Sequence, residues 1–250
     1  AASGELACGT TGKGRMQEID VLVAAAEYAL TPKTMAGKHV LITAGPTQEA
    51  IDPVRYISNA STGKMGYALV QACLNRGAEV TLVTGPTHLS LKPWQEFCPL
   101  HVTNVVSSAE MCQATVTAFQ QADIAILCAA VADFTPNTTA QQKIKKQPGQ
   151  TGMNIELKTT TDIAAQLGAA KQTHQTLVGF ALETHDEQNN AERKLRSKNL
   201  DMIVLNSLQD KGAGFGVDTN KVTLLYANGT KKDLPLLLKQ EVADAIIDSL

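Results

Sequence analysis

The sequence predicts an α/β fold with a Rossmann-like three-layer architecture: a mostly parallel central sheet, helices on both faces and a small C-terminal β-hairpin. From residue 38 onward, short apolar runs alternate with segments of helical length, which is typical of a parallel sheet. Near the end of the chain, residues 222–226 are followed by Asn228-Gly229, a dipeptide that favours the tight turn of a hairpin.

The first half of the alternation has clear boundaries. Gly77 is suited to end one helix, because glycine readily adopts the left-handed conformation found after helix C-termini. Ser107 and Glu110 have the spacing of a capping box and predict the start of the next helix. The elements expected in this half are strand 39–43, helix 62–76, strand 79–84, strand 101–106, helix 108–120 and strand 124–128.

A polar segment, 134–152, interrupts the alternation before it resumes. Residues 1–30 also stand apart, since they have a glycine-rich start and a short helix expected at 17–30, before a break at Thr31-Pro32. We expect residues 1–30 to be loosely held. The elements expected after the polar segment are strand 153–158, helix 161–171, strand 176–181, helix 187–199, strand 201–205, the hairpin and a closing helix at about 237–249.

Composition argues against several classes of function. The formal net charge of −2 provides no basic surface for nucleic acid or for an anionic membrane, so neither is expected as a partner. The longest strongly apolar run, 124–132, has nine residues, which is too few to cross a bilayer. The five cysteines show no paired spacing, which favours reduced thiols and a cytoplasmic location. The histidines show no ligand spacing either, so no metal ligand is assigned.

Residues 38–66 combine a buried strand, a small-residue turn and the start of a helix, an arrangement that presents backbone N–H groups to phosphate. Neither common phosphate-binding motif fits this segment. A Walker A loop would need glycine where Ser58 stands and Ser or Thr where Met65 stands. Only Gly63-x-x-Gly66 can be read of a dinucleotide-binding GxGxxG motif. We therefore expect the loop to serve a more specialised site.

A second candidate site lies at the end of strand 124–128, where residues 129–132 are small and Asp133 follows. In open α/β sheets, ligands bind outside the carboxyl ends of the strands, and small side chains let a ligand lie against the backbone. Asp133 would then contact a ribose or a metal. Tight packing of a helix on the sheet, with Asp133 as a helix cap, is the alternative.

Two clusters of cations suggest an anionic ligand. Lys143, Lys145 and Lys146 lie in the polar segment, where a mobile lysine could close on a triphosphate and stabilise developing charge. A solvated run of charges is the alternative for this cluster. Lys194 and Lys198 are spaced i,i+4 on an expected helix, where like charges repel each other unless an anion faces them.

Asn59 comes just before the helix expected at 62–76. Its side-chain amide could bond a substrate carbonyl or an oxyanion, because the amide carries two N–H donors. Asparagine is also a common helix cap, so the residue could instead be purely structural. Chemistry alone leaves both interpretations open.

Together these segments resemble phosphopantothenoylcysteine synthetase of the bacterial, CTP-using type. Each motif is weak alone, but the combination is specific. The similarity covers about residues 36–250, and the motifs that carry it are, in order, ITAGPT, DPVRYISN-x-S, GKMG, AAVADF, KIKK, GFALET and KLRSKNLD. The resemblance implies that residues 36–250 form a phosphopantothenate–cysteine ligase domain.

That family is one half of a bifunctional protein whose other half is a flavin-dependent phosphopantothenoylcysteine decarboxylase. Residues 3–16 resemble the substrate-clamp motif at the end of the decarboxylase, and Cys8 matches its proton-donating cysteine. The resemblance therefore implies that residues 1–35 are a decarboxylase remnant with a linker. FMN is implied only for the decarboxylase, whose flavin-binding part this sequence does not contain.

The activity implied by the resemblance is a two-step ligation in coenzyme A synthesis. The carboxylate of 4'-phosphopantothenate attacks the α-phosphate of CTP, which gives an acyl-cytidylate and pyrophosphate. The amine of L-cysteine then attacks the acyl carbon and releases CMP. Mg²⁺ would accompany CTP, and the domain would form a homodimer, within a larger assembly when the flavin domain is present.

Carried over residue by residue, the resemblance assigns Lys143 to stabilising the transition state of activation. Asn59 would hold the acyl-cytidylate and assist its conversion, and Arg55 would join it in binding the substrate. The family usually has proline where this chain has Thr161. The residues implied to bind CTP are Leu127, Cys128, Ala129, Asp133, Lys143, Thr161, Asp162, Ile163, Ala164, Phe180, Lys194 and Lys198.

Two other classes of function fit the sequence less well than the ligase. A nicotinamide-dependent reductase of the short-chain type needs a Tyr-x-x-x-Lys pair, and none of the four tyrosines has lysine at that offset. A non-enzymatic nucleotide-binding or assembly module would not need Asn59 and Lys143. The sequence therefore favours the ligase.

Overall fold

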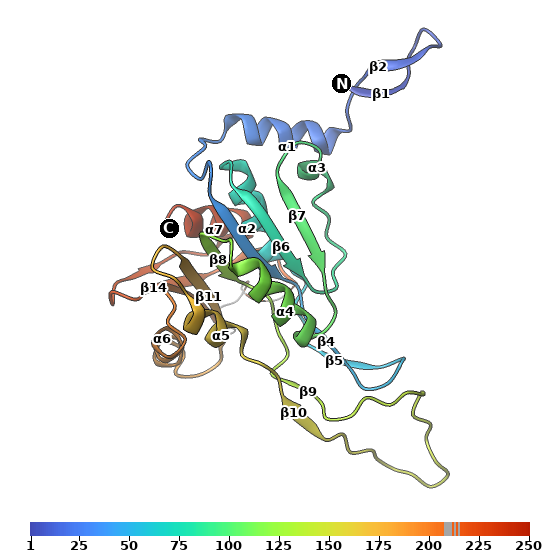
Figure 1. The fold of residues 1–250 in the computed structure, drawn as a ribbon, viewed down its shortest axis with the longest axis vertical. Coiled ribbons are helices and arrows are strands. Elements are labelled where there is room, and N and C mark those ends of the chain that lie inside the picture. The colour runs from blue at the N-terminus through green and yellow to red at the C-terminus, as the bar shows by residue number, and fades with distance from the viewer. Residues whose placement is uncertain (208–211, 213, 215) are drawn as a thin grey trace.

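The computed structural model describes residues 1–207, 212, 214 and 216–250, and a mixed sheet of eight strands forms its centre (Figure 1). The strand order is β15-β14-β12-β11-β8-β3-β6-β7. The six strands from β7 to β12 run parallel, whereas β14 is antiparallel to both of its neighbours. The bounds are β3 His39–Ala44, β6 Glu79–Thr84, β7 Leu100–Asn104, β8 Ile124–Leu127, β11 Thr176–Glu183, β12 Met202–Ser207, β14 Val222–Tyr226 and β15 Lys231–Asp233.

The central strands are buried on both faces, as a parallel sheet between two helical layers requires. Val40, Leu41 and Ile42 of β3 are each at most 1% exposed, although neighbouring side chains of a strand point to opposite faces. Val40 is in register with Val80 of β6 and with Ile124 of β8. The mostly parallel sheet and the C-terminal hairpin predicted from the sequence are therefore confirmed.

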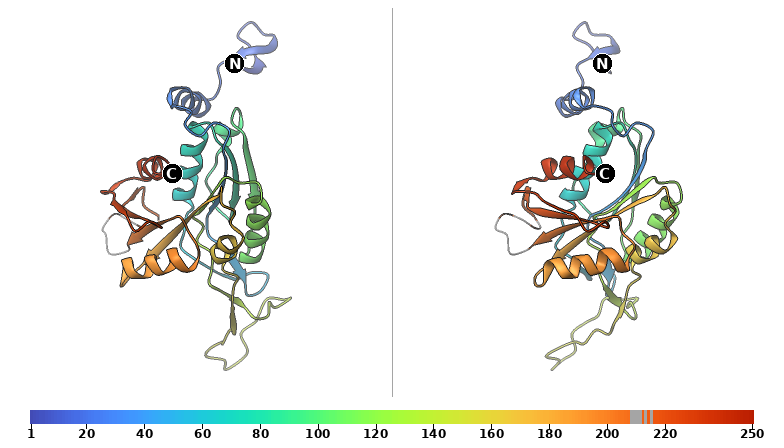
Figure 2. Two further views of the ribbon diagram at one scale, coloured as in Figure 1. Left: turned by 60° about the vertical axis from the view of Figure 1, so that its left-hand side comes forward. Right: turned by 90° about the vertical axis from the view of Figure 1, so that its left-hand side faces the viewer.

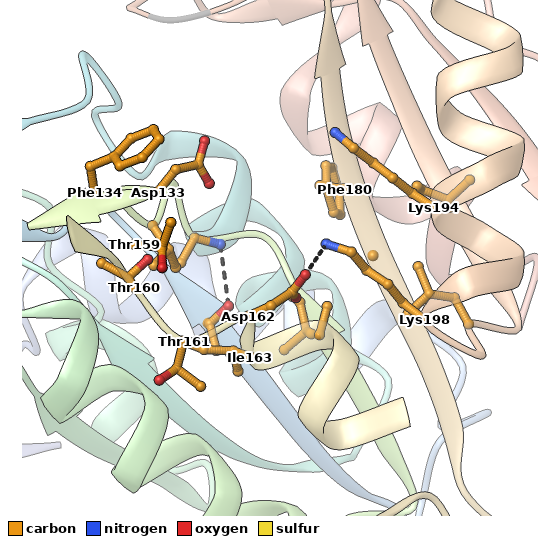
Figure 3. A pocket seen from close by; sticks show the side chains of 18 residues that line it. Asp133, Phe134, Thr159, Thr160, Thr161, Asp162, Ile163, Phe180, Lys194 and Lys198 are labelled. Carbon is orange, nitrogen blue, oxygen red and sulfur yellow. Dashed lines mark hydrogen bonds and ion pairs between the residues drawn. The ribbon is translucent and has the colours of Figure 1, made fainter. Parts of the chain in front are cut away.

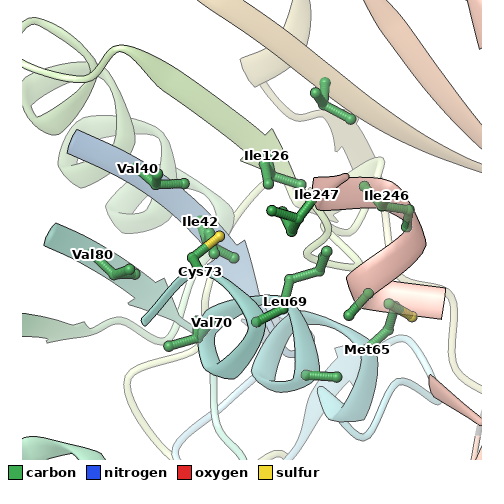
Figure 4. Packing of buried hydrophobic residues seen from close by; sticks show 14 of the residues in the cluster. Val40, Ile42, Met65, Leu69, Val70, Cys73, Val80, Ile126, Ile246 and Ile247 are labelled. Atoms are coloured by element: carbon green, nitrogen blue, oxygen red, sulfur yellow. The ribbon is translucent and has the colours of Figure 1, made fainter. Parts of the chain in front are cut away.

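Helices cover the two faces of the sheet unequally. On one face α2 and α7 pack against apolar side chains of the sheet, as Figure 4 shows for Leu69, Val70 and Ile246. The opposite face is covered by α4, α5 and α6 (Figure 2). These helices are α2 Lys64–Asn75, α4 Ser108–Phe119, α5 Ile163–Ala170, α6 Glu187–Ser197 and α7 Lys239–Ile247.

Local sequence signals explain where two of the helices begin. The predicted capping box of α4 is present: Ser107 Oγ accepts from the Glu110 N–H at 3.2 Å, and the Glu110 carboxylate accepts from the Ser107 N–H at 3.1 Å. Backbone donation from Val106 and Ser107 lowers the pKa of Glu110. Helix α2 begins two residues later than expected, after Gly63 in a left-handed conformation with φ of 81°.

The polar segment forms an arm that projects from the body at the carboxyl ends of the parallel strands (Figure 1). Its base is a two-stranded ladder of β9 Phe134–Pro136 and β10 Leu157–Thr159. It lies beside a second hairpin of β4 Gln48–Ala50 and β5 Tyr56–Ser58. The strand expected at 153–158 within the central alternation is therefore wrong. All three residues of β10 are exposed, so no buried face holds them in the main sheet.

The N-terminal residues extend from the opposite end of the molecule (Figure 1). β1 Ala2–Glu5 and β2 Thr11–Arg15 form a hairpin that the sequence analysis did not anticipate. Helix α1, Ile19–Leu30, follows and packs next to the short helix α3, Lys92–Gln95. The remaining short strands are β13 Thr219–Asn220 and β16 Leu237–Leu238, which pair with each other. Within the described residues, no helix combines the length and apolar character needed to cross a membrane.

Candidate functional site

A cavity of about 410 Å³ opens beside the carboxyl end of β8, between the base of the arm and helix α6 (Figure 3). Ten of the twelve residues predicted to bind CTP line it, so strand ends that are distant in sequence meet where the fold class predicts a ligand. The lining residues are Thr43, Leu127, Ala129, Val131, Asp133, Phe134, Thr159, Thr160, Thr161, Asp162, Ile163, Ala164, Gly179, Phe180, Lys194, Lys198, Leu200 and Ile203.

Asp162 organises one wall of this first cavity. Its carboxylate caps α5 by accepting from the Ala165 N–H at 3.0 Å, and it pairs with Lys198 Nζ at 2.9 Å. Burial alone would raise the pKa of Asp162, but the hydrogen bonds from Ala165 and Lys198 outweigh it and leave the pKa below its ordinary value. Asp162 thus stays ionised and holds the Lys198 ammonium at the cavity.

Lys194 and Phe180 lie on the same side of the first cavity as Lys198, opposite Asp133 (Figure 3). Lys194 Nζ pairs with Glu183 at 2.6 Å, and the Glu183 side chain is only 12% exposed. Two ammonium groups therefore line the first cavity, each balanced by one carboxylate. Such a site favours a ligand with several negative charges, because the ligand can replace the two carboxylates as the partner of the ammonium groups.

A second cavity, of about 330 Å³, lies at the N-terminus of α2. Backbone N–H groups at a helix N-terminus favour an anion. The second cavity shares four residues with the first: Ala129, Val131, Asp133 and Phe180. Its other lining residues are Asn59, Ser61, Thr62, Gly63, Lys64, Met65, Gly66, Cys128, Ala130, Ala181, Leu182, Asn206, Gly214, Asn220 and Lys239.

Asn59 does not cap α2. Its Nδ2 donates to the carbonyl oxygens of Ala130 and Val131, at 3.0 and 3.1 Å. The N-cap residue of α2 is Gly63, whose own N–H donates to Ser61 Oγ at 3.3 Å. The helix-cap interpretation of Asn59 is therefore wrong, and the residue instead holds the wall between the two cavities.

Hydroxyl groups fix the rest of this wall. Thr43 Oγ1 accepts from the Ala129 N–H at 3.2 Å, and the fully buried Thr47 accepts from the Ala132 N–H at 3.0 Å. Thr160 Oγ1 donates to the Ala132 carbonyl at 2.7 Å. The small residues after β8 therefore form a backbone surface with a defined position, against which a flat ligand can lie.

Several polar residues of the second cavity were not predicted from the sequence, among them Lys239 and Asn206. Lys239 is 8% exposed, and its ammonium donates to the carbonyls of Gly214 and Thr219, both at 3.1 Å. Burial, together with the charge of Lys64, lowers its pKa. Asn206 Oδ1 is buried without a hydrogen-bond partner among the described residues. Asn206 lies near the carboxyl end of β12, and a polar residue ending a buried strand is the signal that could have identified it.

Four predicted site residues lie elsewhere. Cys128 lines the second cavity rather than the first, and burial raises the pKa of its thiol to about 12. Lys143 is exposed on the arm and lines neither cavity, and Arg55 is paired with Asp52 in the β4–β5 hairpin. Cys8 lies on the N-terminal hairpin, at the far end of the molecule. In the described part of the chain, no group of three or more His, Cys, Asp or Glu side chains is arranged to hold a metal.

The sequence model of the DFP family, described as the DNA/pantothenate metabolism flavoprotein C-terminal domain, matches residues 35–250. The chain belongs to this family. It is 49% identical, over 253 aligned residues, to the Coenzyme A biosynthesis bifunctional protein CoaBC of Bacillus subtilis strain 168, and it covers 60% of that protein's length. All of this chain takes part in the alignment.

Two further similarities bear on the DFP domain. The crystal structure of the C-terminal domain of a CoaBC protein superposes with a TM-score of 0.71 at 39% identity, over 87% of this chain and 95% of that one. A protein of an unknown prokaryotic organism, named cysteine/cysteine sulfinic acid decarboxylase, is 53% identical over 250 residues. That alignment covers 98% of this chain and 68% of the relative. The chain thus spans about 60% of the CoaBC protein and about two thirds of this second relative.

Proposed function

We propose that residues 36–250 act as a CTP-dependent phosphopantothenate–cysteine ligase of coenzyme A biosynthesis. The observation that carries the proposal is the wall shared by the two cavities, which includes Ala129, Val131, Asp133 and Phe180. A nucleotide in the first cavity and an acyl substrate in the second would meet at this wall. Transfer of a cytidylyl group to a carboxylate requires that approach. Membership of the DFP family and the similarity to CoaBC support the same assignment.

The first half-reaction would activate the carboxylate. A carboxylate oxygen of 4'-phosphopantothenate forms a bond to the α-phosphorus of CTP, the bond from that phosphorus to the bridging oxygen breaks, and pyrophosphate leaves. Lys194 and Lys198 line the first cavity and would offset the charge of the triphosphate. Lys143 would come from the arm and stabilise the charge that develops on the transferring group.

The second half-reaction would form the amide. The neutral amine of L-cysteine attacks the acyl carbon, the bond to the cytidylate oxygen breaks, CMP leaves, and the nitrogen loses a proton. The acceptor Asn206 Oδ1 in the second cavity, which has no hydrogen-bond partner among the described residues, supports a ligand with N–H or O–H groups there, because a buried acceptor costs free energy until a donor reaches it. Pantothenate carries both kinds of donor.

Magnesium would be held mainly by the nucleotide. Mg²⁺ usually keeps several water ligands and binds through substrate phosphates plus one or two carboxylates. Asp133 fits that pattern, because it lies on the shared wall and is exposed to the cavities. The ion would offset the negative charge of the phosphate oxygens. Asp162 is less suited, since it is already paired with Lys198 and caps α5.

The name of the 53%-identical relative raises decarboxylation as a second activity. Cys8 is the residue of this chain that the sequence resemblance connects with decarboxylation. It lies on the N-terminal hairpin, away from both cavities. The geometry of residues 36–250 therefore favours ligation.

The test is a stepwise assay of the purified chain with Mg²⁺. CTP and 4'-phosphopantothenate together should release one equivalent of pyrophosphate, and addition of L-cysteine should release CMP and give sustained turnover. CTP alone should release none. Pyrophosphate release that does not depend on 4'-phosphopantothenate, or a requirement for NADP, would reject the proposal. Replacing CTP with ATP or UTP in the same assay measures the preference for the base.

A further inference from the structure

Asp52 is a buried carboxylate with a dense set of donors. It is 2% exposed, and its Oδ1 accepts from the backbone N–H groups of Val54 and Arg55, both at 2.9 Å. Its Oδ2 accepts from Arg55 Nε at 3.1 Å, from Arg55 Nη2, and from the Ile144 N–H at 3.0 Å. A buried charge is tolerated only when it is paired and hydrogen-bonded, so this arrangement is specific rather than incidental.

These contacts join two segments that are about 90 residues apart. Arg55 Nη2 also donates to the Ile144 carbonyl at 2.9 Å, so both backbone groups of Ile144 are held, one by Asp52 and one by Arg55. We name Asp52 and Arg55 together the Asp52–Arg55 clamp. A further hydrogen bond joins the same two segments: the Ala140 N–H of the arm donates to the Ile51 carbonyl at 3.0 Å.

The clamp fixes the backbone at Lys143. The peptide group that joins Lys143 to Ile144 is planar, so a bond that holds the Ile144 N–H also places the Lys143 Cα. The Lys143 side chain itself remains exposed. An ammonium on a long chain reaches its target more often when the Cα is already placed, because less conformational entropy is lost at the moment of reaction.

We propose that Asp52 and Arg55 are positioning residues that hold the Lys143 segment against the β4–β5 hairpin, so that its ammonium reaches the α-phosphate of the transferring cytidylyl group. This inference rests on the proposed ligase function. It also changes the role expected for Arg55. The guanidinium is engaged with Asp52 and Ile144, so Arg55 acts through the arm rather than by binding 4'-phosphopantothenate.

The clamp is expected to hold over the working pH range. The hydrogen bonds from Arg55 keep the pKa of Asp52 well below its usual range, so the carboxylate is ionised at neutral pH. Asparagine has nearly the same shape, but one of its two terminal groups donates instead of accepting. In Asp52→Asn, an amide N–H₂ would face either the Ile144 N–H and the Arg55 side chain, or the N–H groups of Val54 and Arg55.

A double-mutant cycle tests the inference. Lys143→Gln should slow pyrophosphate release by about 10²–10³-fold, and Asp52→Asn should slow it by about 10–10²-fold. If Asp52 acts through Lys143, adding Asp52→Asn to Lys143→Gln should cost less than about twofold more. Asp233→Asn is the matched control, because Asp233 is 64% exposed on β15 and should leave the rate unchanged. Equal losses in both backgrounds would overturn the proposal.

A second readout does not depend on activity. The Ile144 amide should exchange its hydrogen slowly in the wild-type chain and at least tenfold faster in Asp52→Asn, because its acceptor is lost. Faster exchange with an unchanged rate of pyrophosphate release would overturn the positioning role. If the wild-type chain releases no pyrophosphate, the proposed function fails, and the exchange result still reports whether the clamp holds the arm.

Arg55→Lys covers the case in which Asp52→Asn does not fold. Lysine keeps the charge, but it cannot span Asp52 and the Ile144 carbonyl with a planar fork. The positioning role predicts a lower kcat for pyrophosphate release and a KM for 4'-phosphopantothenate within about twofold of wild type. A raised KM with an unchanged kcat would assign Arg55 to the substrate and overturn its part of the proposal.

Discussion

Asn59 shows how one side chain can affect both cavities at once. Its Nδ2 holds the carbonyls of Ala130 and Val131, and this short segment lies on the boundary between the two cavities. An amide suits this position, because a carboxylate has no donor at neutral pH and would repel two carbonyl oxygens. Both N–H donors are engaged here, so Asn59 either only places the wall or exchanges one of these carbonyls for the acyl oxygen of a bound substrate.

Asn59→Asp separates these two roles through the two half-reactions. We expect pyrophosphate release within about threefold of wild type and product formation lowered by about 10²–10³-fold, as for loss of an oxyanion donor. The acyl-cytidylate should then accumulate, which quenched-flow chromatography can measure. If both half-reactions slow equally, Asn59 acts by placing the wall. Normal turnover would show that the amide is not needed.

The cysteines differ in ionisation because their surroundings differ. The hydrogen bond with the Thr10 hydroxyl lowers the pKa of the exposed Cys8. Burial raises the pKa of Cys73 to about 12, as it does for Cys128. Since the thiolate is the reactive form, reactivity should follow this order.

Iodoacetamide should therefore alkylate Cys8 first in the folded chain. The thiolate fraction rises with pH, and a lowered pKa moves that rise to lower pH, so Cys8 should react half-maximally at a lower pH than it does in urea. Cys73 and Cys128 should stay unmodified at about pH 7 until the chain unfolds. Peptide mass mapping measures all of the sites in one sample. Equal labelling of Cys8 and Cys73 would contradict the assignment of these environments.

At the scale of elements, capping is the clearest link between sequence and stability. The Ser107 and Glu110 side chains satisfy three backbone donors at the start of α4, and this helix helps to cover one face of the sheet. Replacing Ser107 with alanine removes one acceptor and leaves the helix interior unchanged. The resulting change in the free energy of unfolding therefore measures the contribution of the cap.

Ser107→Ala should lower the free energy of unfolding by about 1 kcal/mol. For a chain of this size, that corresponds to a decrease in Tm of roughly 2–4 °C. Ser197→Ala, at an exposed position near the end of α6, serves as the control and should change stability by less than about 0.5 kcal/mol. A loss at Ser107 no larger than at the control would mean that the capping box contributes nothing measurable. Differential scanning calorimetry of the three proteins decides between these outcomes.

The elements that could be predicted from the sequence are those in which buried apolar residues recur at the spacing typical of a strand or a helix. Strand β6 was expected at its observed bounds, because its alternating apolar residues are buried. β10 was misplaced because three exposed residues carry no such pattern, and their position depends only on pairing with β9. The N-terminal hairpin was missed for the same reason, since none of the nine residues in β1 and β2 is buried and six of them are exposed.

The site residues that could be predicted from the sequence are those at the carboxyl ends of the parallel strands. Leu127 and Asp133 follow from the rule that ligands bind at the carboxyl ends of parallel strands. Lys239 could not be found in this way, because its partners are the carbonyls of Gly214 and Thr219, which precede it by 25 and 20 residues. The support of Lys143 by Asp52 depends on a contact across 92 positions, which no local pattern contains.

At the scale of the whole molecule, the two ends of the sheet are different. The cavities, the arm and the β4–β5 hairpin lie at the carboxyl ends of the parallel strands, while α1 and the N-terminal hairpin lie at the other end (Figure 1). The predicted homodimer and the larger assembly with a flavin domain stay predictions, and light scattering of the purified chain can test the first. The separation of the two ends suggests that the N-terminal segment can change without altering the site.

Two truncations test this separation. Strands β1 and β2 pair with each other, so removing residues 1–17 takes away little packing and should change the Tm by less than about 2 °C. Helix α1 is different, because Tyr28 packs edge-on against Phe97 with ring centroids 5.6 Å apart, and Ala24 is fully buried. Removing residues 1–30 would expose this contact and cost about 2–3 kcal/mol, which lowers the Tm by roughly 4–12 °C.

Both truncated chains should keep the KM for CTP within about twofold of the full chain, because the first cavity draws its lining from residues 43–203. Thermal unfolding and pyrophosphate release on the same samples separate stability from function. Rapid amide exchange at residues 1–16 of the full chain should accompany the small effect of the first truncation, since a two-stranded hairpin is marginally stable alone. A loss of CTP binding in the 1–17 truncation would show that the hairpin communicates with the site, and the two ends of the sheet would then have to be treated as one functional unit.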